Sequence, residues 1–315
     1  MSEKYETIVP SEPDAGERLQ WVSWLRSAAP YVHLHHGRTF VISFAGEVVA
    51  DRTLLNHLVM DVSLIASMGM RVVLVHGSRP QIEELMGLRK LEGQFYKGVR
   101  ITGPQELECV KEACGETRFD IEAAFSQGLP NTPMQHSRIK VVSGNFVTAR
   151  PMGIIDGVDY LHTGVVRKVD AESIQDLLSR GNIVLVSPTG FSPTGEAFNL
   201  TTEDVATAIA VAIRADKLIL SVGVDGVRVR GEKQQDLTAQ QAQALIQSKQ
   251  VDDEDVYNLG YALRAIKGGV DRVHIVPYAM DGGILTELFT HDGVGTMIST
   301  ENMESLREAT IDDVA

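Results

Sequence analysis

Short apolar runs alternate with stretches of helical spacing along most of the chain, and this alternation restricts the fold more than any other feature. Six runs are mostly apolar and rich in β-branched residues, as in strands buried on both faces: TFVISFA, RVVLVHG, RIKVVSG, NIVLVSP, KLILSVG and RVHIVPY. Helical stretches separate most of them, at residues 52–68, 80–91, 105–126, 171–179, 203–214, 239–248 and 256–267. Strands alternating with helices form βαβ units, so the sequence predicts an α/β fold with a parallel sheet.

Local signals mark several helix starts and one irregular insertion. Asp170 and Thr238 are N-cap candidates, Pro80 suits a first helical turn, and Thr201 with Asp204 resembles an acidic capping box. The segment GNFVTARPMGIIDGVDYLHTGVVRKVD lacks a helical period. We expect it to form antiparallel hairpins that could cover a site.

Composition excludes several classes of protein. The chain has 315 residues, 43% of them hydrophobic, which suits one large or two medium domains. It contains no apolar run of about 18 residues and opens on a polar, acidic stretch, so we expect neither a membrane span nor a secretory signal. Cys109 and Cys114 fall on different faces of one predicted helix, which disfavours a disulfide and indicates the cytoplasm. A net charge of −13 argues against a nucleic-acid surface.

The two ends of the chain differ from its middle. Residues 1–17 are polar and acidic with two prolines, and we expect a flexible lead. Residues 18–38 predict a helix with an apolar stripe formed by Trp21, Trp24, Leu25 and Ala28. This helix could pack on its own core. It could instead bind a partner, because its stripe lies outside the first strand and carries two tryptophans. Residues 301–315 end on a helix-start signal, so we expect the opening of a further domain there.

Candidate sites follow the predicted strands, because ligands of open α/β sheets bind beyond the carboxyl ends of the strands. The small-residue turn at 43–46 resembles half of a phosphate cradle, and the turn at 76–82 leads into a helix whose N-terminus could receive an anion. Further polar residues follow other strands: Arg100, Asn199, Asp204 and Asp225. The HLHH run at 33–36 would place two histidines on one face of a strand. No cysteine or carboxylate cluster joins them, so we expect no metal site.

The order of these motifs resembles that of the amino acid kinase family. The resemblance covers residues 18–300 and rests on VLVHG..PQI, G.R.T, VSGN, the A.KLIL…DGV run and LFT.DG.GTMI. It is strongest toward the acetylglutamate kinases and the kinase-like domains of N-acetylglutamate synthases. The resemblance implies a three-layer αβα sandwich over residues 39–300, preceded by an oligomerisation helix. It also implies that 301–315 begin an acetyltransferase domain.

Departures from the kinase pattern concern the phosphate site. Where a kinase of this branch carries a lysine and paired glycines, this chain has Ser43 and Ala45, and Ser78 and Arg79 replace two further glycines. A second expected lysine falls in the acidic stretch DDEDVYNLGYALRAIKGG. Phosphoryl transfer depends on positioned charge, and one lost donor typically costs about 10²–10³ in rate. We therefore expect no catalytic residue and a vestigial pocket formed by Ser43, Ala45, Gly46, Gly77, Ser78, Arg79, Arg100, Asn199 and Asp204.

The resemblance also implies an effector site. Arginine-sensitive members of the family bind L-arginine, a feedback inhibitor, between the N-terminal helix and the C-terminal part of the domain. The matching positions here are Tyr31, Lys217, His274, Glu287, Gly293 and Gly295. A carboxylate such as Glu287 suits the guanidinium fork, and Lys217 with the turn at 293–296 could hold the α-carboxylate.

The resemblance thus predicts an arginine-sensing regulatory domain of an enzyme that makes N-acetylglutamate from acetyl-CoA and glutamate. Acetyl-CoA would be a substrate of a domain outside these 315 residues, and this chain would hold no cofactor. We expect a homo-oligomer built through the N-terminal helix. Two alternatives stay open: an active acetylglutamate kinase that uses ATP, and a stand-alone regulatory subunit that acts in trans.

Overall fold

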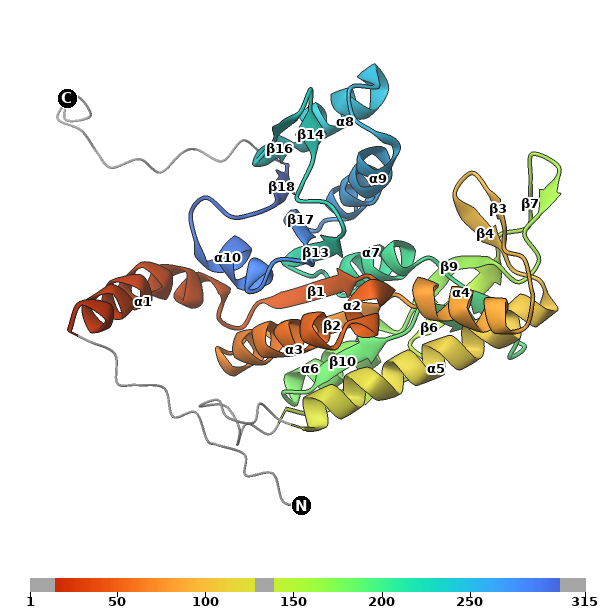
Figure 1. Cartoon of the computed structure of the whole chain (residues 1–315), viewed down its shortest axis with the longest axis horizontal. Coiled ribbons are helices and arrows are strands. Elements are labelled where there is room, and N and C mark those ends of the chain that lie inside the picture. The colour runs from red at the N-terminus through yellow and green to blue at the C-terminus, as the bar shows by residue number, and fades with distance from the viewer. Residues whose placement is uncertain (1–14, 128–138, 301–315) are drawn as a thin grey trace, which may run out of the picture.

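A mostly parallel sheet forms the centre of the molecule, which a computed structural model describes over residues 15–127 and 139–300. Eight strands follow the order β16-β18-β17-β13-β1-β2-β10-β5, and among neighbours only β17 and β18 run antiparallel (Figure 1). The strands are β1 (Thr39–Phe44), β2 (Arg71–His76), β5 (Val141–Ser143), β10 (Ile183–Val186), β13 (Lys217–Val222), β16 (Asp236–Thr238), β17 (Arg272–Pro277) and β18 (Thr296–Ser299). All six predicted strands lie in this sheet, whereas β16 and β18 were not predicted.

The central strand β1 is buried on both faces and explains why the predicted runs are apolar throughout. Phe40 and Ile42 enter one hydrophobic cluster, while Val41 enters the cluster on the opposite face. This is the two-residue alternation of a strand covered on both sides.

Helices cover the two faces of the sheet and complete the three layers of the predicted fold. On the face of Phe40 lie α3 (Arg52–Ser67), α5 (Pro104–Ser126) and α10 (Gly283–Phe289). On the face of Val41 lie α6 (Ala171–Ser179), α7 (Thr202–Ala212), α8 (Ala239–Ser248) and α9 (Asp253–Lys267). The remaining helices are α1 (Ala15–His35), α2 (Gly46–Ala50) and α4 (Arg79–Leu88). The bounds of α6 and α8 are as predicted, whereas α2 and α10 were missed.

Two of the predicted helix caps are confirmed and one is wrong. Asp170 accepts a hydrogen bond from the backbone of α6, and Thr238 forms a full capping box with Gln241. Thr201 occupies the N-cap position of α7, but its side chain makes no capping hydrogen bond. Its predicted partner Asp204 is bound instead to an arginine of α9, as described below.

The described residues also form a second, smaller sheet and three two-stranded hairpins. The smaller sheet has the order β12-β11-β6-β9, and its strands are β6 (Val147–Pro151), β9 (Gly164–Val169), β11 (Thr189–Phe191) and β12 (Ala197–Asn199). Two-stranded hairpins are β3 (Gln94–Tyr96) with β4 (Val99–Ile101), β7 (Ile154–Ile155) with β8 (Val158–Asp159), and β14 (Arg228–Val229) with β15 (Glu232–Lys233). The β3–β4 and β7–β8 hairpins lie side by side (Figure 1), and Lys97 and Asp156 join them through an ion pair of 2.6 Å. The hairpins predicted after β5 are thereby confirmed.

The N-terminal helix α1 extends away from the sheet (Figure 1). Trp21 and Trp24 are 64% and 52% exposed, whereas Ala28 is buried. The histidines at 33–36 close this helix, so the strand expected there is wrong. Residues 1–14 and 301–315, which hold most of the predicted lead and the whole predicted tail, lie outside the described residues. Among the described helices, none has the length and apolar character needed to cross a membrane.

Candidate functional site

A buried cluster of titratable side chains lies where β13, β17 and α10 meet. Lys217 opens β13, and His274 lies two positions further along the neighbouring strand, because Lys217 is paired with Arg272 in the parallel register. Diagonal neighbours of this kind share one face of a sheet. The Lys217 ammonium accordingly lies 3.0 Å from Nε2 of His274.

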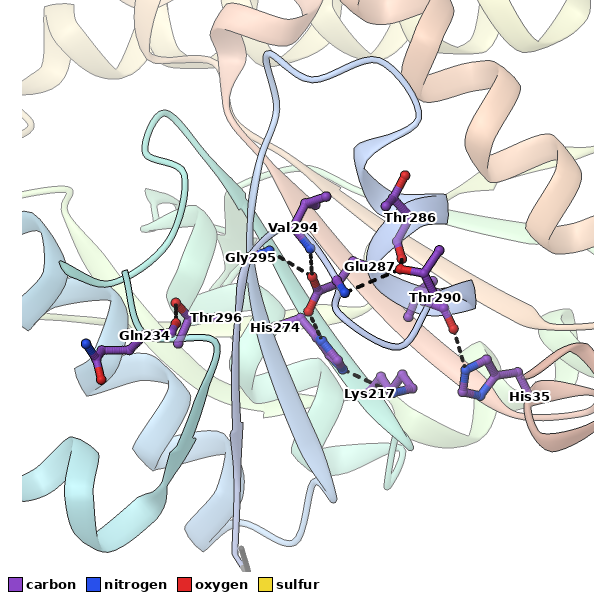
Figure 2. Close-up of polar contacts among 12 residues, drawn as sticks. His35, Lys217, Gln234, His274, Thr286, Glu287, Thr290, Val294, Gly295 and Thr296 are labelled. Atoms are coloured by element: carbon purple, nitrogen blue, oxygen red, sulfur yellow. Dashed lines mark hydrogen bonds and ion pairs between the residues drawn. The ribbon is translucent and has the colours of Figure 1, made fainter. Parts of the chain in front are cut away.

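Glu287 on α10 extends this contact into a chain of three residues (Figure 2). Its Oε1 lies 2.7 Å from Nδ1 of His274, and its Oε2 accepts hydrogen bonds from the backbone N–H groups of Val294 and Gly295 at 2.7 and 2.8 Å. The His274 and Glu287 side chains are only 4% and 5% exposed. We call Lys217, His274 and Glu287 the polar chain.

The charge changes from positive to neutral to negative along the polar chain. Burial, together with the nearby Lys217 charge, lowers the pKa of His274 to about 4, so the imidazole is neutral at pH 7. Its Nδ1–H therefore donates to Glu287, and its Nε2 accepts from Lys217. Burial also lowers the pKa of Lys217 to about 8, which leaves it an ammonium at neutral pH.

For Glu287 itself, burial opposes ionisation. The hydrogen bonds from His274, Val294 and Gly295 outweigh burial and lower the pKa of Glu287 to about 2. The buried chain is thus ammonium, neutral imidazole and carboxylate in that order.

Two glycines let the turn at 293–296 close over Glu287. Gly293 has a φ of +59°, and a Cβ there would stand 2.6 Å from Oε2 of Glu287. A Cβ on Gly295 would stand 2.1 Å from the carbonyl oxygen of Ile275. The sequence predicted that backbone N–H groups of this turn hold a ligand carboxylate. Those of Val294 and Gly295 donate their hydrogen bonds to Glu287 instead.

The end of α1 packs against α10 beside the polar chain. His35, labelled in Figure 2, donates from Nε2 to the carbonyl of Leu288 at 3.0 Å. Its ring meets Phe289 edge to face. Burial is the main reason why the pKa of His35 falls to about 4, so this imidazole is neutral too. Tyr31, one turn earlier, is half-buried against the same hydrophobic cluster. Sequence reasoning considered His35 only as a metal ligand and missed this contact.

At the vestigial pocket, the two predicted phosphate loops pack directly on each other. A Cβ on Gly77 would stand 2.8 Å from the backbone nitrogen of Gly46, and a Cβ on Gly46 would stand 2.7 Å from Gln81 Oε1. Ser43 is buried within β1, and Ala45 occupies the N-cap position of α2 without capping it through its side chain. The first loop is therefore closed by backbone contact.

A neutral hydrogen-bond network fills the second loop. His76 lies 2.8 Å from Oγ of Ser187 through Nε2, and Oγ of Ser78 lies 3.2 Å from its Nδ1. Burial lowers the pKa of His76 to about 4. Ser78 is buried and faces this network, while Arg79 is exposed and pairs with Glu83 at 3.1 Å.

The remaining residues of the predicted pocket have partners within the protein. Arg100 is buried and pairs with Glu83 at 3.2 Å while its guanidinium covers the ring of Phe95. Asn199 donates to Thr102, whose backbone N–H and hydroxyl join Thr163 beside Arg100. Asp204 lies apart from these residues and pairs with Arg264 of α9 at 2.7 Å. Within the described residues, no group of three or more histidine, cysteine or acidic side chains could hold a metal ion.

Comparison with known proteins assigns the family. The profile of the amino acid kinase family matches residues 38–277. This chain belongs to the amino acid kinase family. The predicted resemblance and fold are confirmed.

Relatives at about 50% sequence identity are named amino-acid acetyltransferases. An amino-acid acetyltransferase of Ralstonia nicotianae is 55% identical over 303 residues, covering 96% of this chain and 67% of the relative. N-acetylglutamate synthase of Neisseria gonorrhoeae, solved with coenzyme A and L-arginine, superimposes with a TM-score of 0.83 at 35% identity, over 93% of this chain and 69% of that one. The same synthase solved with coenzyme A and N-acetyl-glutamate gives a TM-score of 0.82 and covers 67% of that chain.

Proposed function

We propose that this chain is the arginine-sensing, kinase-like part of an N-acetylglutamate synthase, which transfers the acetyl group of acetyl-CoA to L-glutamate in the cytoplasm. The buried Glu287 carboxylate carries the proposal, because it lies beneath a glycine turn and beside α1. The synthase of Neisseria gonorrhoeae, which binds L-arginine in its solved structure, has the same fold at 35% identity.

The polar chain has the chemistry that L-arginine requires. A carboxylate oxygen can accept more than one hydrogen bond, and Oε1 of Glu287 is bound to His274 alone among the contacts found for it. A guanidinium carries five N–H donors in a fork that suits a carboxylate. Lys217 keeps N–H donors beyond the one bound to His274, and these would receive the α-carboxylate. Gly293 and Gly295 would let the backbone approach the ligand, and Tyr31 would approach it from α1.

The kinase-like pocket would not transfer phosphate. Its loops are in backbone contact at Gly46 and Gly77, and His76 is neutral where a nucleotide phosphate would need positive charge. Acetyl-CoA would be handled by another part of the enzyme, and we expect no resident cofactor here. A stand-alone subunit acting in trans would use the same effector site and differ only in where the acetyltransferase lies.

We also propose that α1 joins copies of the chain. Leu19, Trp21, Trp24 and Leu25 are all exposed on this helix, at 71%, 64%, 52% and 47%. Large exposed aromatic residues typically anchor interfaces. L-arginine would then act on an oligomer.

Isothermal titration of the chain with L-arginine tests the effector site. We expect micromolar-range binding that Glu287→Gln abolishes, whereas Asp292→Asn, an exposed carboxylate in the same turn, leaves it unchanged. L-citrulline, which replaces the guanidinium by a neutral urea, should bind weakly to the unmodified chain. Equal binding of both ligands, or full binding by Glu287→Gln, would contradict the site, and binding of magnesium-ATP with no arginine heat would restore the kinase alternative.

A further inference from the structure

The β14–β15 hairpin is anchored to the turn that covers Glu287. Thr296, the last residue of the 293–296 turn, is fully buried. Its hydroxyl donates to the backbone carbonyl of Gln234 at 2.5 Å (Figure 2). The same hydroxyl accepts a hydrogen bond from the backbone N–H of Val227 at 2.8 Å. Val227 and Gln234 flank the hairpin, so both of its ends are bound to the turn.

Lys233, in β15, makes a second contact with the turn. Its ammonium donates to the backbone carbonyl of Val294. This carbonyl belongs to the same peptide group as the N–H of Gly295, which donates to Oε2 of Glu287 at 2.8 Å. A cation bound to the oxygen of a peptide group polarises it and makes its N–H a stronger donor, since hydrogen bonds in a chain reinforce one another. The positive charge of Lys233 is thus transmitted to the buried carboxylate through one peptide group.

Each oxygen of Glu287 is therefore linked to a lysine through one uncharged polar group. Oε1 is bound to His274, whose other ring nitrogen lies 3.0 Å from the Lys217 ammonium. Oε2 is bound to the Gly295 N–H, in the peptide group that holds Lys233. Among the described residues, no ion pair joins Glu287 to either lysine. A lysine in direct contact would compete with a ligand guanidinium for the carboxylate, whereas a lysine acting through a peptide group leaves room for it.

We propose that Lys233 is a positioning residue of the L-arginine site, which fixes Glu287 by binding the peptide group between Val294 and Gly295. This inference rests on the proposed function. Loss of the Lys233 ammonium would weaken the Gly295 N–H as a donor and remove one anchor of the turn. Glu287 would then be held less firmly before the ligand arrives, and ordering it would become a cost of binding.

Amide NMR of the unliganded chain tests the contact. Gly223 and Gly295 are the only glycines that follow a valine, so ¹³C at the valine carbonyl with ¹⁵N in glycine selects these two amides. Lys233→Met keeps an unbranched stem but removes the ammonium. We expect it to shift the Gly295 amide proton upfield, because the hydrogen bond to Glu287 weakens. Gly223 is the internal reference and should move little, since its peptide carbonyl is bound by the N–H of Tyr278.

Titration calorimetry with L-arginine tests the positioning role. Lys233→Met should lower the affinity on the order of tenfold, the scale of one hydrogen bond to a charged group. Lys233→Arg keeps a cationic donor and should recover most of the affinity. Lys168→Met, which changes an exposed lysine of β9, is the matched control and should bind L-arginine as the unmodified chain does.

The two measurements separate failure of this inference from failure of the proposed function. An unmoved Gly295 amide in Lys233→Met would overturn the peptide contact. A shifted amide with unchanged arginine affinity would show that Lys233 does not position Glu287 for the ligand. A shifted amide in a chain that binds no L-arginine, even unmodified, would leave the contact in place and refute the effector assignment.

Discussion

Gly295 lies directly against the carbonyl of Ile275, with no room for a side chain between the 293–296 turn and β17. A Cβ there would be 2.1 Å from a backbone oxygen that is held in the central sheet. The turn can keep its two hydrogen bonds to Glu287 only while residue 295 is glycine. The shape of the proposed effector site therefore depends on residue 295 having only a hydrogen atom as its side chain.

Gly295→Ala should therefore destabilise the fold by about 1–3 kcal/mol and weaken L-arginine binding, because the turn must move away from Glu287. Urea unfolding and titration calorimetry measure the two effects. Gly260→Ala is the control: it adds a Cβ in α9 with no atom within 4 Å, and it should stabilise the helix by about 0.5–1 kcal/mol. An unchanged arginine affinity in Gly295→Ala would contradict the role of the turn.

Stability should fall when the pH is lowered from 7 to 5, because three buried histidines resist protonation. His35, His76 and His274 have folded pKa values of about 4 and an ordinary value of 6.5. The stability they provide is present above pH 6.5 and is lost as the pH falls through 4, on the order of 3 kcal/mol each. Burial raises the pKa of Asp61 on α3 to about 7, so this carboxyl group titrates in the opposite direction and offsets about one of them. Urea unfolding at pH 7.0, 6.0 and 5.0 measures the loss, and His274→Gln should reduce it; a flat profile would refute the neutral assignments.

L-arginine should change the tryptophan fluorescence of the chain. Both tryptophans, Trp21 and Trp24, lie on α1, and His35 connects the end of α1 to Leu288 beside Glu287. His35→Phe keeps an aromatic ring against Phe289 but loses the donor to Leu288, so it should reduce the fluorescence response more than the affinity. A response of full size in His35→Phe would show that α1 senses the ligand by another route.

Polar substitutions on α1 should reduce the size of the assembly. Trp21→Ser with Leu25→Ser removes two exposed apolar side chains, and light scattering after gel filtration should show a smaller particle. Leu88→Ser is the control, since Leu88 is 75% exposed on α4, away from α1. An unchanged mass in the α1 variant would exclude this helix as the interface.

The core of the fold could be predicted because its strands are apolar on both faces and its long helices are periodic. The helix α10 was missed because its seven residues are too few to show a helical period. Glycine also occupies its N-cap position, Gly282, and its first position, Gly283. The capping pair predicted for Thr201 and Asp204 does not form, and a tertiary contact takes its place. Arg264, 60 residues after Asp204, binds the carboxylate and the backbone carbonyl of Asp204.

Prediction of the candidate site depended on the family resemblance, because the sequence spacing of its residues does not indicate that they lie close together. Lys217 and His274 meet only through the register of β13 with β17, 57 residues apart in sequence.

A helix of seven residues does not persist in water by itself, since isolated helices shorter than about 12–15 residues are marginal. Contacts with neighbouring segments therefore hold α10 in place: His35 of α1 donates to the carbonyl of Leu288, and the 293–296 turn donates two backbone hydrogen bonds to Glu287. Whether α10 stays folded or frays thus sums two inputs, the position of α1 and the closure of the 293–296 turn. Hydrogen exchange of its amides would record that sum directly.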